Sequence, residues 1–147
     1  MNFDKFIKEY NEIYKAYLRE YHVFATKLGL SDCALNILYE LRVENRGISQ
    51  KELGEALSLS KQTVNSAIKT LEEMGIVRLT EAREKNRTKL VVFTEKGDKF
   101  AADNIDKIIR AENVAFDSLE KTSVESMLKT VRKYYDNFAG EASKIKF

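Results

Sequence analysis

The sequence predicts a mainly α-helical fold with one small β-hairpin. Proline is absent from the 147 residues and glycine occurs only six times, so few residues interrupt helices. Apolar residues recur at steps of three and four along most of the chain, which is the spacing of amphipathic helices. The exception lies between residues 76 and 93, where two β-prone runs flank a charged loop and predict the hairpin.

The composition predicts one globular domain in the cytoplasm. Hydrophobic residues make up 44% of the chain and charged residues 33%, a balance that permits a buried core and excludes general disorder. The single cysteine excludes an intrachain disulfide and suits a reducing compartment. The N-terminus lacks the apolar segment of a signal peptide, and no window approaches the roughly 20 apolar residues that span a membrane.

Long amphipathic helices are expected at both ends of the chain. The first runs from Phe3 to Lys27, and Gly29 is placed to end it. Ser31 can cap a second helix. Helical spacing returns from about Lys96 to Phe147, with an interruption near residues 118–123. The terminal stripes carry more apolar surface than a small domain can cover alone, which favours burial against a second chain.

The middle of the chain has the pattern of two short helices joined by a tight turn. Ser49 and Glu52 form the S-x-x-E signature of a capping box at the start of the first. After a turn at residues 58–59, Ser60 can cap the second helix, and Gly75 is placed to end it. Followed by the hairpin, this order predicts a winged helix-turn-helix fold with dimerisation helices at both ends.

The second of these helices carries a polar face that can contact DNA. Its cations, amides and hydroxyls are groups that bind phosphates and the edges of bases. The alternative is the solvated face of an ordinary surface helix. The candidate DNA contacts in this region are Ser49, Ser60, Lys61, Gln62, Thr63, Asn65, Ser66 and Lys69.

The loop of the hairpin, or wing, is too polar to pack and carries a cluster of cations. An arginine at the tip of such a loop can enter the minor groove of DNA, where the negative potential is strongest. The alternative is a solubilising loop whose cations pair locally with Glu81 and Glu84. The candidate contacts here are Arg83, Lys85, Asn86, Arg87 and Thr88.

No pattern indicates catalysis or a metal centre. His22 is the only histidine and no Cys/His cluster exists, so the usual metal ligands are missing. No nucleophile–base motif or glycine-rich phosphate loop stands out, and we expect neither enzyme activity nor a cofactor. Cys33 follows Asp32, whose carboxylate would raise the pKa of the thiol, so a packed thiol is favoured over a redox sensor.

The chain resembles the MarR family of bacterial transcription regulators. The residues that carry the resemblance are QKELGEAL, SKQTVNSAIKTLEEMGIV and AREKNRTKLVVFTEKG. The resemblance covers nearly the whole chain as one domain, residues 1–147. It implies dimerisation helices at residues 1–29 and 98–147 and a DNA-binding lobe at residues 31–97, and it aligns Arg87 with the family's groove-entering arginine.

The resemblance also implies how the protein acts. It implies a homodimer that binds a pseudo-palindromic operator, represses a promoter by occupying it, and responds to a small-molecule effector. The implied pocket would take a small aromatic effector, with Tyr14, Tyr17, Tyr21 and His22 as candidate lining residues. A place in the core or at an interface is the alternative for each of these residues.

Two rival functions are compatible with the same fold. One is a winged-helix protein-interaction module without DNA binding, and the other is the dimerisation domain of an enzyme. The cations retained on the polar helix face and in the wing favour DNA as the partner over the first of these. The second is disfavoured because no second domain follows in this sequence.

Overall fold

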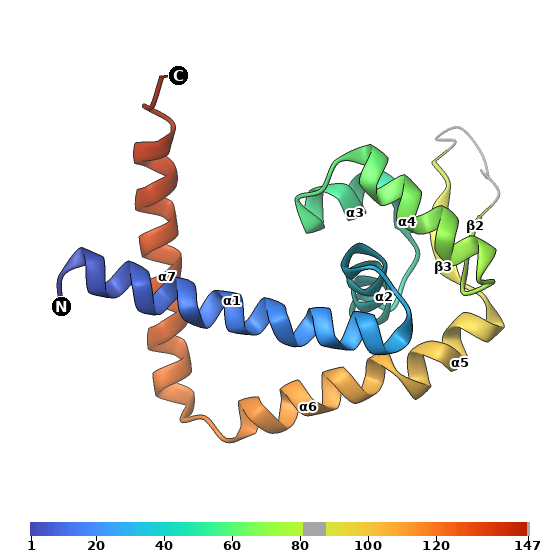
Figure 1. Cartoon of the computed structure of the whole chain (residues 1–147), viewed down its shortest axis with the longest axis horizontal. Coiled ribbons are helices and arrows are strands. Elements are labelled where there is room, and N and C mark those ends of the chain that lie inside the picture. The colour runs from blue at the N-terminus through green and yellow to red at the C-terminus, as the bar shows by residue number, and fades with distance from the viewer. Residues whose placement is uncertain (81–87, 147) are drawn as a thin grey trace. The chain divides into compact units, whose positions relative to one another are not determined.

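The computed structural model describes residues 1–80 and 88–146, and Figure 1 shows its helices and strands coloured along the chain. The chain falls into two units divided between Lys107 and Ile108. No helix among the described residues is long and apolar enough to cross a membrane. The elements in chain order are α1 (Phe3–Leu28), α2 (Asp32–Glu44), β1 (Ile48–Ser49), α3 (Gln50–Leu57), α4 (Lys61–Glu73), β2 (Val77–Leu79), β3 (Leu90–Phe93), α5 (Glu95–Asp103), α6 (Ile105–Asp117) and α7 (Lys121–Ala142).

The end of the first helix and the start of the second lie where the sequence predicts them. Helix α1 ends at Gly29, which adopts the left-handed conformation with φ of 68° and is therefore suited to a residue without a Cβ. The Ser31 hydroxyl accepts a hydrogen bond from the Ala34 backbone N–H and caps α2. Both boundaries follow from local chemistry, which is why they can be predicted without knowledge of the fold.

Helices α3 and α4 form the predicted helix-turn-helix. Ser49 and Glu52 make both hydrogen bonds of the capping box at the start of α3. The turn after α3 passes through Ser58, which has a φ of 52°. A Cβ on Gly54 would lie 3.3 Å from the Leu59 carbonyl oxygen, so the small residue permits the close approach of the turn. The Ser60 hydroxyl then caps α4.

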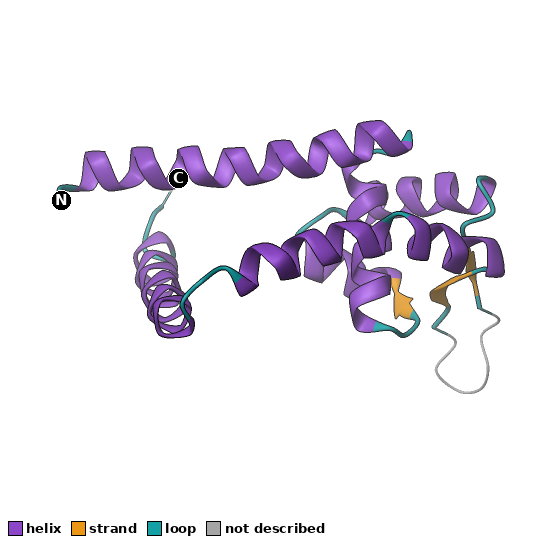
Figure 2. Cartoon of the chain, turned by 90° about the horizontal axis from the view of Figure 1, so that it is seen from below, coloured by secondary structure: helices purple, strands orange, loops and turns teal. Residues whose placement is uncertain are grey.

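A three-stranded antiparallel sheet, ordered β1-β3-β2, completes the lobe (Figure 2). Strands β2 and β3 form the predicted hairpin, with Val77 opposite Phe93. Strand β1 was not predicted, because two residues directly before a helix cap are too short to show an alternating pattern. It pairs with β3, with Ile48 opposite Val91, and thereby ties the residues before α3 to the hairpin.

The hydrophobic core of the first unit lies between α2, α3, α4 and the sheet. Its fully buried large side chains come from α2, α3, α4, the residue before β2, strands β2 and β3, and the first residue of α6. They are Leu35, Ile37, Leu38, Leu53, Val64, Ile68, Leu71, Ile76, Val77, Val91 and Ile105.

The C-terminal helices are interrupted between Asp117 and Lys121, as the sequence predicts, and once more at a position where it predicts no break. Helix α5 ends at Asp103, and Asn104 interrupts the helix with φ of −128° and ψ of −58° before α6 begins. The Asn104 amide donates to the Phe100 carbonyl at 2.9 Å and so satisfies an acceptor at the end of α5. Neither glycine nor proline marks this break, so the sequence carries no local signal for it.

The second unit contains most of α6 together with α7. Helix α7 has no buried residue, and several of its large apolar side chains are more than half exposed, among them Met127, Leu128, Tyr135 and Phe138. In the first unit, α1 is also largely exposed and only Ala25 in it is buried. These faces match the apolar stripes that the sequence predicts at both ends.

Candidate nucleic-acid interface

The orientation of α4 follows from its buried stripe. Val64, Ile68 and Leu71 are at most 1% exposed and anchor the helix on the core. The opposite side of the helix is therefore turned to solvent, as its apolar and polar stripes predict. We define the reading face as the exposed residues Lys61, Gln62, Asn65, Ser66 and Lys69.

The N-terminus of α4 presents positive charge. Its first turn contains no acidic residue, so the partial positive charge of the helix end is not compensated locally. Neither Lys61 nor Lys69 forms an ion pair with another residue among those described. Lys61 lies at the N-terminus of the helix and Lys69 about two turns further along. Lysines placed in this way suit contact with phosphate groups.

Ser60 and Thr63 lie beside the reading face and hold the start of the helix. The Ser60 hydroxyl accepts from the Thr63 N–H at 3.1 Å and lies 2.8 Å from the Thr63 hydroxyl. Both residues are exposed, so the predicted contacts at these positions stay compatible with the structure. Their hydroxyls are already engaged with one another, which limits how freely they can turn toward DNA.

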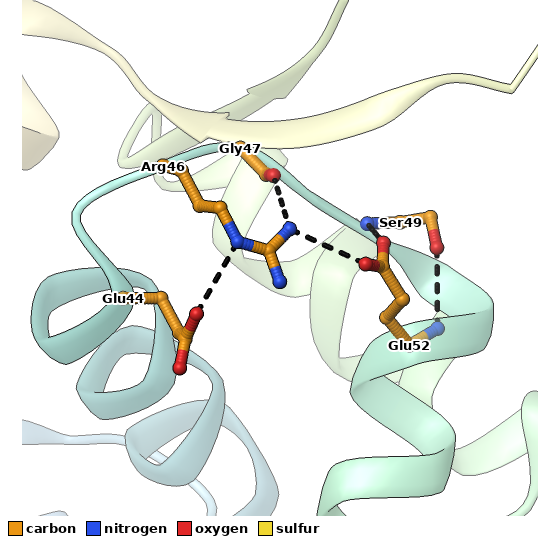
Figure 3. Close-up of polar contacts among 5 residues, drawn as sticks. All are labelled: Glu44, Arg46, Gly47, Ser49 and Glu52. Atoms are coloured by element: carbon orange, nitrogen blue, oxygen red, sulfur yellow. Dashed lines mark hydrogen bonds and ion pairs between the residues drawn. The ribbon is translucent and has the colours of Figure 1, made fainter.

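An arginine network orients α3 against the end of α2, as Figure 3 shows. Arg46 donates to Glu44 at 3.2 Å, to the Gly47 carbonyl at 3.2 Å and to Glu52 at 3.3 Å. Hydrogen bonds from Ser49, followed by the contact with Arg46, lower the pKa of the Glu52 carboxyl. Nothing in the local sequence pattern predicts this network.

Ser49 does not belong to the reading face. Its side chain points into the capping box, where its hydroxyl accepts from the Glu52 N–H at 3.2 Å, and the residue is only 6% exposed. A buried hydroxyl that already caps a helix is poorly placed to contact DNA. We therefore remove Ser49 from the predicted DNA contacts and assign it to the start of α3.

The Ser49→Ala variant is expected to lose stability and keep its DNA affinity. Loss of an N-cap hydroxyl costs about 1 kcal/mol. Urea unfolding followed by circular dichroism gives the stability, and titration of labelled duplex gives the affinity of the folded protein. A tenfold loss of affinity at unchanged stability would restore Ser49 to the interface.

Most of the predicted wing contacts cannot be placed. Arg83, Lys85, Asn86 and Arg87 lie outside the described residues, so these four stay predictions. The base of the wing is described, and Thr88 is exposed there. Thr80 and Leu90 exchange two hydrogen bonds of 2.8 and 2.9 Å that join the two strands at the base.

The predicted effector residues all lie on α1, and two of them, Tyr21 and His22, contact residues of α2. The Tyr17 hydroxyl donates a hydrogen bond to the Tyr21 hydroxyl at 3.1 Å. The rings of Tyr21 and Tyr39 form a T-shaped pair with their centroids 6.1 Å apart. Tyr39 is not among the candidate residues predicted from the sequence. His22 pairs with Asp32 at 2.9 Å. Tyr14 is 54% exposed. The structure thus brings Tyr17 and Tyr21 together with Tyr39.

Cys33 is a partly buried thiol. Its sulfur lies 4.0 Å from the Thr63 carbonyl oxygen, and burial raises the pKa of the thiol. The expected direction of this shift is correct, but its cause is burial and not the neighbouring Asp32 carboxylate. A thiol with a raised pKa is a poor nucleophile at neutral pH, which favours the packing role.

Comparison with known proteins identifies the protein family of this chain. Residues 33–78, from the start of α2 to β2, match the family model described as winged helix-turn-helix DNA-binding. The chain is also 31% identical over 105 residues to the uncharacterised HTH-type transcriptional regulator YybA of Bacillus subtilis, covering 65% of this chain and 67% of that protein. The chain belongs to the HTH-type transcriptional regulators.

Solved structures show that the regulator has the MarR fold. NMB1585, a MarR family regulator from Neisseria meningitidis, matches 99% of this chain and 100% of its own with a TM-score of 0.79 and 24% identity. A MarR family transcriptional regulator from Listeria monocytogenes, solved with 26mer DNA, matches 96% of each chain with a TM-score of 0.72 and 22% identity. The MarR resemblance and the fold class predicted from the sequence are confirmed, and the regulator is a DNA-binding protein.

Proposed function

We propose that this regulator is a dimeric, sequence-specific repressor that reads duplex DNA with α4 and the wing. The observation that supports the proposal most is the reading face, because it combines two lysines that pair with no other described residue with two exposed carboxamides on an anchored helix. Residues 31–97 form the DNA-binding lobe in this proposal, and residues 1–29 and 98–147 supply the dimerisation helices.

The side chains of the reading face suit two different kinds of contact with DNA. The carboxamides of Gln62 and Asn65 each offer one donor and one acceptor group, the combination that pairs with adenine in the major groove. Lys61 and Lys69 carry charges suited to phosphate or to guanine. The five-residue face is narrow enough to enter the major groove as part of one helix.

Homodimer formation is supported by the exposed apolar side chains of the terminal helices. Those on α1 include Phe3, Ile13, Tyr17 and Leu18, and those near and on α7 include Leu119, Leu128 and Phe138. Apolar surface on this scale is typical of a protein–protein interface. Two-fold symmetry would then place two reading faces on half-sites about one helical turn apart. Analytical ultracentrifugation at micromolar concentration is expected to give the mass of a dimer.

Control by a small aromatic effector is supported by the tyrosine cluster. Tyr17, Tyr21 and Tyr39 join α1 to α2, at the edge of the lobe that carries α4. A Staphylococcus aureus MarR, 16% identical to this chain with a TM-score of 0.69, has been solved in complex with salicylate and kanamycin. An effector at this cluster would act by favouring dimers whose reading faces are wrongly spaced for the operator.

Selection of bound duplexes from random DNA tests the proposal directly. We expect enrichment of a pseudo-palindromic motif, and its affinity should fall when salicylate or another small aromatic acid is added. A protein that enriches no motif and binds duplexes without preference would be incompatible with a sequence-specific repressor. Absence of any DNA binding would instead favour the protein-interaction module.

The Gln62→Ala variant is expected to lose discrimination at one base-pair position of each half-site. Loss of a bidentate contact to adenine reduces discrimination there by about 1–3 kcal/mol, which is roughly 5- to 150-fold. Repeating the selection with the variant measures this, and the preferences at all other positions serve as the internal control. An unchanged preference at every position would rule out direct reading by Gln62.

A further inference from the structure

One arginine of α2 holds both helices that follow the wing. Arg42 donates from Nε and Nη2 to the two carboxylate oxygens of Asp106, each at 2.7 Å, and from Nη1 to Asp98 at 2.8 Å. Asp98 belongs to α5 and Asp106 to the first turn of α6. We call this set of three residues the Arg42 clamp.

The clamp bridges the break between α5 and α6. Asn104 is the single non-helical residue there, and the two aspartates lie on either side of it in the sequence. Backbone hydrogen bonds from Asn104 to Phe100 and from Lys107 to Asn104 remain at this break, but the regular helical pattern is interrupted. Such an interruption allows the angle between two helices to change, and we refer to it as the α5–α6 hinge. The Arg42 side chain connects the two helices across this hinge, because it binds one residue of each helix.

The geometry of the clamp resists small rotations. The two parallel bonds to Asp106 are bidentate, and a planar guanidinium keeps such a pair in one orientation. The Arg42 and Asp106 side chains are only 24% and 27% exposed, so solvent screens their interaction less than that of a surface pair. The hydrogen bonds to Asp106 and Asp98 also raise the pKa of Arg42, which keeps it charged.

The helix that the clamp holds leads directly out of the DNA-binding lobe. Ile105 is fully buried in the core of the first unit, whereas residues from 108 onward belong to the second unit. Helix α6 is continuous from Ile105 to Asp117. The first turn of this helix, which contains Asp106, therefore lies in the first unit, and the rest of the helix belongs to the second.

We propose that the Arg42 clamp is the positioning device that locks the α5–α6 hinge and thereby sets the spacing of the two reading faces in the dimer. The inference rests on the dimer of the proposed function. An intact clamp restricts the dimer to a narrow range of spacings, which makes it select operators with one half-site separation. A broken clamp lets the hinge bend, so the dimer accepts several separations and binds the best one less tightly.

The test uses Arg42→Met and Asp106→Asn in the full-length protein. The affinity of each is measured for a series of operators whose half-site separation is changed one base pair at a time. We expect the preference for the best separation over its neighbours to fall about fivefold or more, a change at the lower end of conformational coupling effects. The double variant Arg42→Asp with Asp106→Arg re-forms an ion pair and is expected to recover part of the preference.

Arg46→Met is the matched control, because it removes the same charge from a neighbouring arginine. Arg46 pairs with Glu44 and Glu52 and has no hydrogen bond to α5 or α6. Its spacing preference is expected to match that of the wild type. Thermal unfolding of each variant identifies any loss of affinity that comes from a smaller folded fraction, which would lower the affinity for every separation equally.

Three outcomes decide between the possibilities. A loss of spacing preference in Arg42→Met but not in Arg46→Met supports the clamp. Equal spacing profiles for wild type, Arg42→Met and Asp106→Asn in a dimeric protein would overturn it and leave the proposed function intact. A wild-type mass of a monomer in ultracentrifugation would overturn the dimer itself and the clamp inference with it. If Arg42→Met does not fold, Asp98→Asn, which spares the bidentate pair, replaces it in the same comparison.

Discussion

Replacing Lys61 and Lys69 together with alanine is expected to weaken binding to the selected duplex about 100-fold. Both side chains are exposed on the reading face and free of ion pairs with other described residues. A hydrogen bond to a charged group contributes about 1.5 kcal/mol or more, so the loss of two such contacts corresponds to about two factors of ten. If both lysines contact phosphates, the slope of log affinity against log salt concentration should also fall by about 2.

The control for this variant removes the same charge elsewhere in the first unit. Lys27 near the end of α1 and Lys99 in α5 are both exposed, and neither lies on α3 or α4. The Lys27→Ala, Lys99→Ala variant changes the net charge equally, so fluorescence anisotropy titrations at several salt concentrations separate a local contact from a general charge effect. Equal losses of affinity in the two double variants would refute the assignment of the reading face.

Gly97→Ala is expected to destabilise the fold by about 3 kcal/mol or more. A Cβ at this position would lie 1.8 Å from the Ile76 carbonyl oxygen and 2.7 Å from the carbonyl carbon. That oxygen already accepts hydrogen bonds from the Thr94 N–H and hydroxyl, at 3.0 and 3.2 Å. Because the obstacle is hydrogen-bonded backbone, α5 would have to move away from the sheet, and overpacking of this severity exceeds the usual 1–3 kcal/mol.

Gly140→Ala provides the matched control. Gly140 also lies inside a helix, and apart from the adjacent backbone of that helix a Cβ there would meet no atom of the described residues within 4 Å. The same substitution should stabilise this helix by up to about 1 kcal/mol, because alanine has the higher helix propensity. Chemical unfolding of both variants measures the difference. A Gly97→Ala protein as stable as the wild type would show that α5 does not pack this closely on Ile76.

The boundaries of the helices could be predicted because their signals are local. Ser31, Ser60 and Thr94 each cap a helix with a side-chain oxygen that reaches a backbone N–H three residues away. Gly29 and Gly75 end helices with φ values of 68° and 71°. Such contacts involve neighbouring residues only, so residue type and spacing are sufficient to predict them.

Local sequence signals predict only part of the candidate DNA-binding site. The exposed face of α4 follows from the alternation of apolar and polar residues, and the structure agrees with it. Ser49 stands one residue before α3 as Ser60 stands before α4, yet only Ser60 is exposed. The difference comes from β1, which pairs with β3 and buries Ser49 at the sheet edge.

The sequence by itself determined the succession of helices, their caps, the wing hairpin and the polar face of α4, because each depends on residues within a few positions of one another. Only the tertiary structure decided the third strand, the break at Asn104 and the ion pairs that orient the helices. Arg42 and Asp106 are 64 positions apart in the chain. No local pattern of charge can indicate such a pairing, because it forms only after the core has brought α2 and α6 together.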